Sequence, residues 1–136
     1  MKRQKGQAVV EFALVLPFFF LILFGVIFSG LLFADYMTLN NAARSSAREA
    51  SIEPSKSADI ATAYNGYFAT NSHFITGLYG TPTFQIDPEI ETPPNSVKVE
   101  VTTNLNTSFP GIGIVSSLLP PSITIEYYMH KEPTST

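Results

Sequence analysis

The sequence predicts an α+β fold, in which a long N-terminal transmembrane helix extends into a small exported domain with a second helix and a three-stranded antiparallel sheet. Three observations predict it: one long apolar run, an apolar stripe at helical period directly after it, and alternating apolar residues towards the C-terminus. We expect residues 1–6 to form a cytoplasmic leader, residues 7–34 the transmembrane helix, and residues 35–136 the exported domain. Within that domain, residues 35–53 are expected to continue the helix.

The apolar run covers residues 12–34, where 19 of 23 residues are apolar. At about 1.5 Å per residue such a helix reaches roughly 34 Å, enough to cross a hydrocarbon core of about 30 Å. Lys2, Arg3 and Lys5 precede it. Because basic flanks stay inside, we expect a single-pass protein of the cytoplasmic (inner) membrane, with its N-terminus inside and its C-terminal domain outside. A cleaved secretory signal has a shorter apolar core, so we expect the helix to be retained.

Two features inside the run bear on how the helix packs. Pro17 removes one backbone donor, which allows a kink or a short non-helical stretch where neighbouring helices cover it. Gly25 and Ser29 lie four residues apart, a spacing of small residues that suits close helix packing but also arises by chance in apolar segments. We expect a packing role for this pair.

Beyond the run, residues 35–53 contain no proline and carry an apolar stripe at helical period. The stripe consists of Tyr36, Leu39, Ala43, Ala47 and Ala50. We therefore expect the helix to continue to Pro54. Arg44 and Arg48 fall on another face, where they either contact an anionic partner or a lipid headgroup, or form a solvated polar face.

A second helix is expected to begin with Ser57 as its N-cap and to end near Asn71. Its apolar face, which we expect to lie in the core, consists of Ile60, Tyr64, Tyr67 and Phe68.

Alternation of apolar and polar residues predicts three strands. The first is a short strand over residues 83–86 that Pro88 ends, followed by a solvated acidic loop. The second covers residues 97–105 and the third residues 123–130, each with one buried and one wet face. The apolar connection over residues 110–121 is expected to pack as a short helix or turn, or, if exposed, to offer a subunit contact.

Composition argues against catalysis and ligand binding. The chain has no cysteine, which excludes a thiol nucleophile, a disulfide and a cysteine-based zinc site. His73 and His130 do not have the spacing of metal ligands, and the acidic residues Asp87, Glu89 and Glu91 lack the glycine turn of a calcium loop. With a net charge of −3 and no phosphate loop or nucleophile elbow, we expect no enzyme, no cofactor, no small-molecule substrate and no nucleic acid.

The residues that open the apolar run form a distinctive segment. Residues 5–12 read KGQAVVEF: the end of a basic leader, a glycine, four residues, then a glutamate and an aromatic residue. This resembles the processing site of type IV pilin-like precursors in its tight-adherence (Tad/Flp) form. Residues 41–44 (NAAR) and the alanine and arginine at 47–48 are similar to the TadE-like minor pseudopilin family. The resemblance covers roughly the first 50 residues, with Phe12 where the family often has tyrosine.

The resemblance implies that a prepilin peptidase cuts between Gly6 and Gln7, leaving a new α-amino group on Gln7. It further implies that Glu11, followed by Phe12, sets the register of subunits when it meets the amine of a neighbour. The implied partners are the prepilin peptidase, other pilins or pseudopilins, the Tad inner-membrane assembly machinery and membrane lipid.

The expected function is therefore that of a minor pseudopilin, a membrane-anchored structural subunit for assembly of an adhesive pilus. The alternative is a membrane-tethered exported binding domain unrelated to pilus assembly, in which the helix is only a tether.

Overall fold

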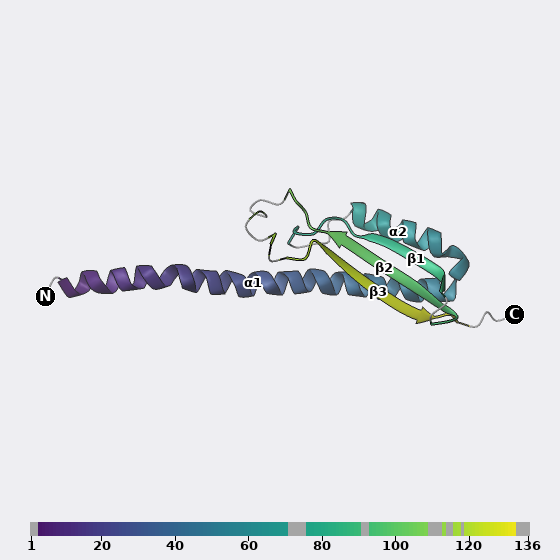
Figure 1. The fold of residues 1–136 in the computed structure, drawn as a ribbon, viewed down its shortest axis with the longest axis horizontal. Coiled ribbons are helices and arrows are strands. Elements are labelled where there is room, and N and C mark those ends of the chain that lie inside the picture. The colour runs from purple at the N-terminus through teal and green to yellow at the C-terminus, as the bar shows by residue number, and fades with distance from the viewer. Residues whose placement is uncertain are drawn as a thin grey trace.

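A computed structural model describes residues 3–70, 76–90, 93–108, 113, 116–117 and 119–132, with side chains described from Gly6 onward. The order of elements is α1 (Arg3–Ile52), the one-turn 3-10 helix η1 (Pro54–Lys56), α2 (Ser57–Thr70), β1 (Thr83–Ile90), β2 (Ser96–Asn104) and β3 (Ser122–His130). The other elements gather around the C-terminal half of α1, and its N-terminal half projects alone (Figure 1). The predicted fold class is confirmed.

The first helix, α1, is one continuous α-helix of 50 residues, about 75 Å long. It remains helical at Pro17, so no non-helical stretch forms there. As the sequence predicts, it ends just before Pro54, with Ile52 as its last residue.

Small residues on one face of α1 let the sheet approach closely. Leu39, Ala43, Ala47 and Ala50 are buried, and they share one core cluster with the inner side chains of β2. The helical stripe predicted from the sequence is therefore confirmed over these four residues. Tyr36, the first member of the stripe, is 41% exposed and lines a cavity near the end of the sheet.

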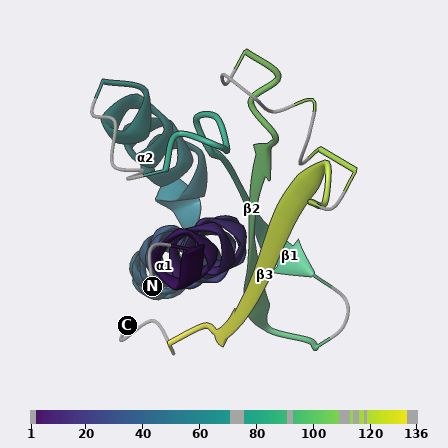
Figure 2. The ribbon, with the colours of Figure 1, turned by 90° about the vertical axis from the view of Figure 1, so that its left-hand side faces the viewer.

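The sheet has the order β1-β2-β3, with both pairs antiparallel. Viewed along α1, both helices lie on the same side of the sheet (Figure 2). The buried face of β2 is the predicted one, with Val97, Val99, Val101 and Thr103 almost inaccessible to solvent. On the other face, Lys98, Glu100 and Thr102 remain partly exposed.

The first strand is longer than predicted. It passes through Pro88 and reaches Ile90, with a shift of register between Asp87 and Ile90. Asp87 and Glu89 therefore belong to the exposed side of β1 rather than to an acidic loop. Proline is tolerated because position 88 directs its missing N–H away from β2, towards the edge of the sheet.

Two predictions about α2 are also wrong. Ser57 is the first residue of α2, but its hydroxyl donates to the carbonyl of Pro54 (2.7 Å), because η1 leads directly into the helix. Tyr67 is 55% exposed, whereas Ile60 and Phe68 are buried and Tyr64 packs at the border of the core. The predictions for His73, Glu91 and half of residues 110–121 lie outside the described residues.

Candidate functional site

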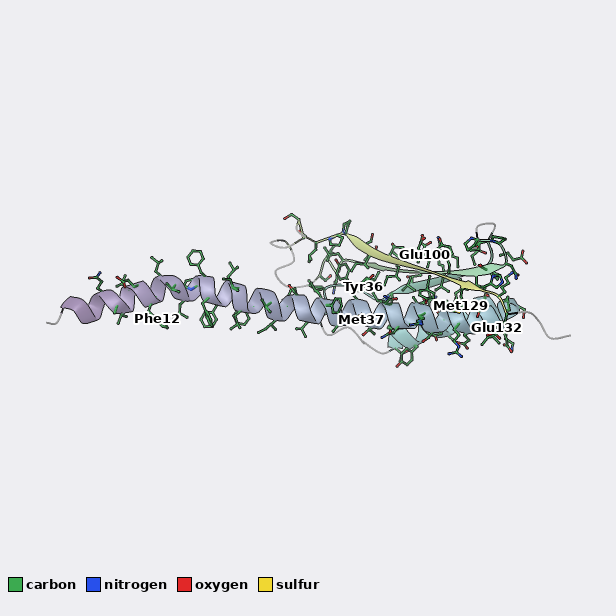
Figure 3. The ribbon with its side chains drawn as sticks, turned by 90° about the horizontal axis from the view of Figure 1, so that it is seen from below. Phe12, Tyr36, Met37, Glu100, Met129 and Glu132 are labelled. Carbon is green, nitrogen blue, oxygen red and sulfur yellow. The ribbon has the colours of Figure 1, made fainter. Side chains whose placement is uncertain are left out.

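The residues of the predicted processing site lie on the first turns of α1. Gly6, Gln7, Glu11 and Phe12 are all exposed, and Phe12 lies far from the sheet (Figure 3). The side-chain amide of Gln7 donates to a carboxylate oxygen of Glu11 (Nε2 to Oε1, 3.1 Å). Gln7 and Glu11 therefore lie one turn apart on the same face, as their spacing of four residues requires.

The helix surface that follows this pair is apolar on every side. From Val9 to Ile27 all its large apolar side chains except Leu16 are exposed, among them Phe18, Leu21 and Phe24. A helix that is apolar all round needs apolar surroundings. The segment is long and apolar enough to cross a membrane, and none of its most apolar window is buried within the molecule. The helix is thus consistent with a membrane anchor or a signal segment.

The predicted packing pair lies in this exposed segment. The hydroxyl of Ser29 donates to the backbone carbonyl of Gly25 (2.8 Å), which satisfies the hydroxyl within the helix. Among the described residues, no atom outside the local helix backbone lies within 4 Å of a side-chain carbon built at Gly25. The small-residue face is therefore open to another helix.

A polar contact marks the point where the sheet begins to cover α1. Asp35 is only 6% exposed and accepts hydrogen bonds from the backbone N–H (3.1 Å) and the hydroxyl (2.5 Å) of Thr76, which follows α2. Next to this pair lies a cavity of about 190 Å³, lined mainly by apolar side chains including Leu32, Tyr79 and Ile123. Asp35 thus links the C-terminal end of the apolar segment to the chain that precedes the sheet.

Sequence pattern does not reveal this contact, because Asp35 and Thr76 are 41 residues apart. The one available signal was a carboxylate directly after an apolar run, where a buried charge needs a partner.

Arg44 and Arg48 are both exposed. They lie on a different face of α1 from Ala43 and Ala47, which are buried under the sheet. The two arginines therefore lie together on an exposed face of α1. They are several helical turns away from Glu11 and from Gly25 and Ser29.

The outer face of the sheet carries a charged network. Lys98 donates to Glu100 (3.0 Å) and Glu126 (2.9 Å), and the hydroxyl of Tyr128 donates to Glu126 (2.9 Å). These bonds raise the pKa of Lys98 and lower that of Glu126, in each case chiefly through the Lys98–Glu126 bond. The bond to Glu126 also raises the pKa of the Tyr128 hydroxyl.

Within the described ranges, no group of three or more His, Asp or Glu side chains could hold a metal ion. His130 ends β3, and its ring lies 3.4 Å from the amide nitrogen of Asn95. The charged groups of the outer sheet face are paired with one another at the surface.

The apolar N-terminal half of α1 projects alone, and its C-terminal half packs against a small α+β head, an arrangement consistent with a pilin-like protein. The model of the TadE-like protein family matches residues 6–48, which confirms the resemblance to that family over this segment. The match begins at Gly6 and ends at Arg48, so α2 and the sheet lie outside it. No curated protein and no solved structure matches the chain.

Proposed function

We propose that this protein is a minor pseudopilin, a membrane-anchored structural subunit for assembly of a Tad/Flp-type adhesive pilus, processed by a prepilin peptidase after Gly6. The observation that carries the proposal is the family match, which starts at Gly6 and runs through Glu11 to Arg48. The exposed apolar surface of α1 supports a role in the membrane, and the small head supports a structural rather than a catalytic role.

Glu11 has the chemistry to set the register of subunits. Cleavage after Gly6 leaves an α-amino group on Gln7, which is cationic at neutral pH. A carboxylate offers about four acceptor positions, so the bond from Gln7 leaves room for the amine of a neighbouring subunit. In apolar surroundings such a pairing is strongly favoured over an unpaired carboxylate, and a misplaced neighbour is penalised.

The basic leader residues Lys2, Arg3 and Lys5 hold the N-terminus in the cytoplasm, where the peptidase acts, and place the head outside. The protein then resides in the inner membrane beside other pilins and the Tad assembly machinery, and from there it can enter the pilus. The open face at Gly25 and Ser29 suits packing against a neighbouring helix of that assembly.

For Arg44 and Arg48 the geometry favours a protein partner over lipid. If residues 7–34 fill the bilayer, Arg44 lies about 14 Å and Arg48 about 20 Å beyond Asp35 along the helix. The headgroup layer on each side is only about 5–8 Å thick. A carboxylate on a neighbouring subunit is therefore the better match for this pair.

The proposal is tested in the native host by exchanging Glu11. We expect the mature protein to begin at Gln7 by mass spectrometry. We expect Glu11→Leu to be inserted and processed, yet to abolish pilus formation and surface attachment. Val10→Leu, an apolar exchange at the neighbouring exposed position, is the matched control and should leave pili intact.

Two results would overturn the proposal: an intact leader on fully matured protein, or normal pili with Glu11→Leu. Both are what a membrane-tethered binding domain unrelated to pili would give.

A further inference from the structure

The two edges of the sheet differ in how their backbone hydrogen-bonding groups are protected from another strand. At the edge formed by β1, the side chain of Asn65 on α2 bonds both backbone groups of Phe84: Oδ1 accepts from its N–H (2.7 Å) and Nδ2 donates to its carbonyl (3.1 Å). Further along the same edge, Pro88 has no N–H to offer. A proline and a side chain that pairs with the backbone both block the approach of another strand.

Within the part of the chain that the structure describes, the edge formed by β3 has neither a proline nor a side chain that pairs with its backbone. Because Phe84 directs its backbone groups away from β2, its partner Val101 bonds to Ile125 on the other side. The backbone groups of Thr124, Glu126 and Tyr128 therefore point to the free edge. Among the described residues, no backbone group pairs with them there. The nine residues of β3 contain no proline, lysine or arginine.

The inner side of this edge is incompletely covered. Ile123, Tyr127 and Met129 pack against the core but are only half-buried, whereas the equivalent residues of β2 are fully buried. Seen from the side of the β3 edge, Tyr36 and Met129 lie towards opposite ends of the seam between α1 and the sheet (Figure 3). The 190 Å³ cavity opens at the start of the same seam, between Tyr36 and Ile123. An additional strand would cover these side chains.

The outer side of the edge carries excess negative charge. Glu100 and Glu126 share one cation, Lys98, so the three groups together carry one net negative charge. Glu126 is the member that lies on β3, next to the free edge. A cation on an added strand, opposite Glu126, would balance it.

We propose that the free edge of β3 binds an extended segment of a partner protein by strand addition, with apolar side chains facing α1 and a basic side chain opposite Glu126. Strand addition uses main-chain hydrogen bonds for affinity and alternate side chains for specificity. The site does not depend on the assembly role proposed above. The choice of a different protein over a second copy of this chain does depend on that role. Two copies anchored in one membrane would present their β3 strands in the same direction and could not pair antiparallel.

The experiment uses the full chain in detergent micelles and a fluorescent nine-residue peptide that copies residues 122–130 with Lys in place of Glu126. We expect this peptide to bind about two- to five-fold more tightly than the same peptide with the native glutamate, which places like charges opposite each other. Thr124→Pro removes a free-edge N–H and should weaken binding at least about ten-fold. Thr124→Ala keeps the N–H and is the matched control, with unchanged binding expected.

Hydrogen exchange on the wild-type chain gives a readout that does not depend on a variant folding. Bound peptide should slow exchange of the amides of Thr124, Glu126 and Tyr128, because these are the amides that the added strand would accept from. The proposal is overturned if the peptide does not bind, if it binds without protecting these amides, or if Thr124→Pro binds it normally. If the full chain forms a dimer and Thr124→Pro makes it monomeric, the partner is a second copy. That result would overturn the choice of a different protein.

Discussion

Between Val9 and Ile27, α1 exposes nearly all its large apolar side chains, whereas between Leu39 and Ala50 the same helix buries a stripe of mostly alanine. The first segment is rich in phenylalanine, leucine and valine, and the second alternates small apolar with polar residues. A helix satisfies its own backbone, so it can pass from one environment to the other without a break. What changes along it is the size and distribution of side chains, which match lipid in the first segment and a closely packed sheet in the second.

The largest expected effect comes from breaking the first segment alone. Ile22→Lys puts a charge near the middle of the apolar run, at a cost of about 2.5–3.5 kcal/mol for membrane insertion. We expect the fraction that resists alkaline extraction from membranes to fall strongly. Because Ile22 does not contact the head, the melting temperature of the head in detergent should be unchanged.

Ile22→Leu is the matched control and should stay in the membrane. A loss of head stability with Ile22→Lys would show that the two segments of α1 are coupled. It would contradict the expectation that the apolar segment and the head are stabilised independently.

An intermediate effect is expected from breaking the second segment alone. Ala47 is completely buried beneath the sheet, so Ala47→Leu overpacks the contact and should destabilise the head by about 1–3 kcal/mol. Thermal unfolding in detergent, followed by near-ultraviolet circular dichroism, measures the loss, while membrane extraction should be unaffected. Ala13→Leu makes the same exchange at an exposed position of the first segment and should change neither quantity.

The smallest effect concerns the outer face of the sheet, which touches neither segment of α1. The pKa of Glu126 is lowered by its bonds to Lys98 and Tyr128, so this network stabilises the folded head above the ordinary glutamate pKa. The contribution is lost as the pH falls through the lowered pKa. The difference in melting temperature between wild type and Lys98→Met should therefore be largest near neutral pH and shrink as the pH falls to about 3. A difference that stays constant over this range would contradict the assignment.

Local pattern was sufficient for α1 and for the strands β2 and β3, because their periodicities are long and their environments uniform. The stripe from Leu39 to Ala50 and the alternation in β2 each identify the buried face without knowledge of the partner. Tyr36 and Tyr67 follow the same periodicities but lie where the covering layer ends, and periodicity does not reveal where a neighbouring element stops.

The remaining misses all depend on contacts between distant parts of the chain. Pro88 was expected to end a strand, but a proline on the free side of an edge strand leaves pairing with β2 intact, and only the register shows which side that is. The pairing of Asn65 with Phe84 and of Asp35 with Thr76 likewise depends on the folded arrangement.

Of the candidate site, the sequence could predict the spacing of Gly6, Gln7 and Glu11, since it is set by a single helix. The sequence could not predict that Gln7 bonds Glu11, because a side chain at this spacing has several rotamers to choose from. The open edge of β3 was also beyond prediction, because whether a strand is central or at an edge depends on sheet order.

Hydrogen bonds at two positions along α1 connect the helix to the rest of the head. Near the apolar segment, Thr76 bonds Asp35, and at the far end the backbone N–H of Glu132 donates to the carbonyl of Ser51 (3.1 Å). The two contacts are about 24 Å apart along α1. A force applied along α1 would therefore be shared between two contacts, one before the first strand and one after the last, rather than acting on one end of the head alone.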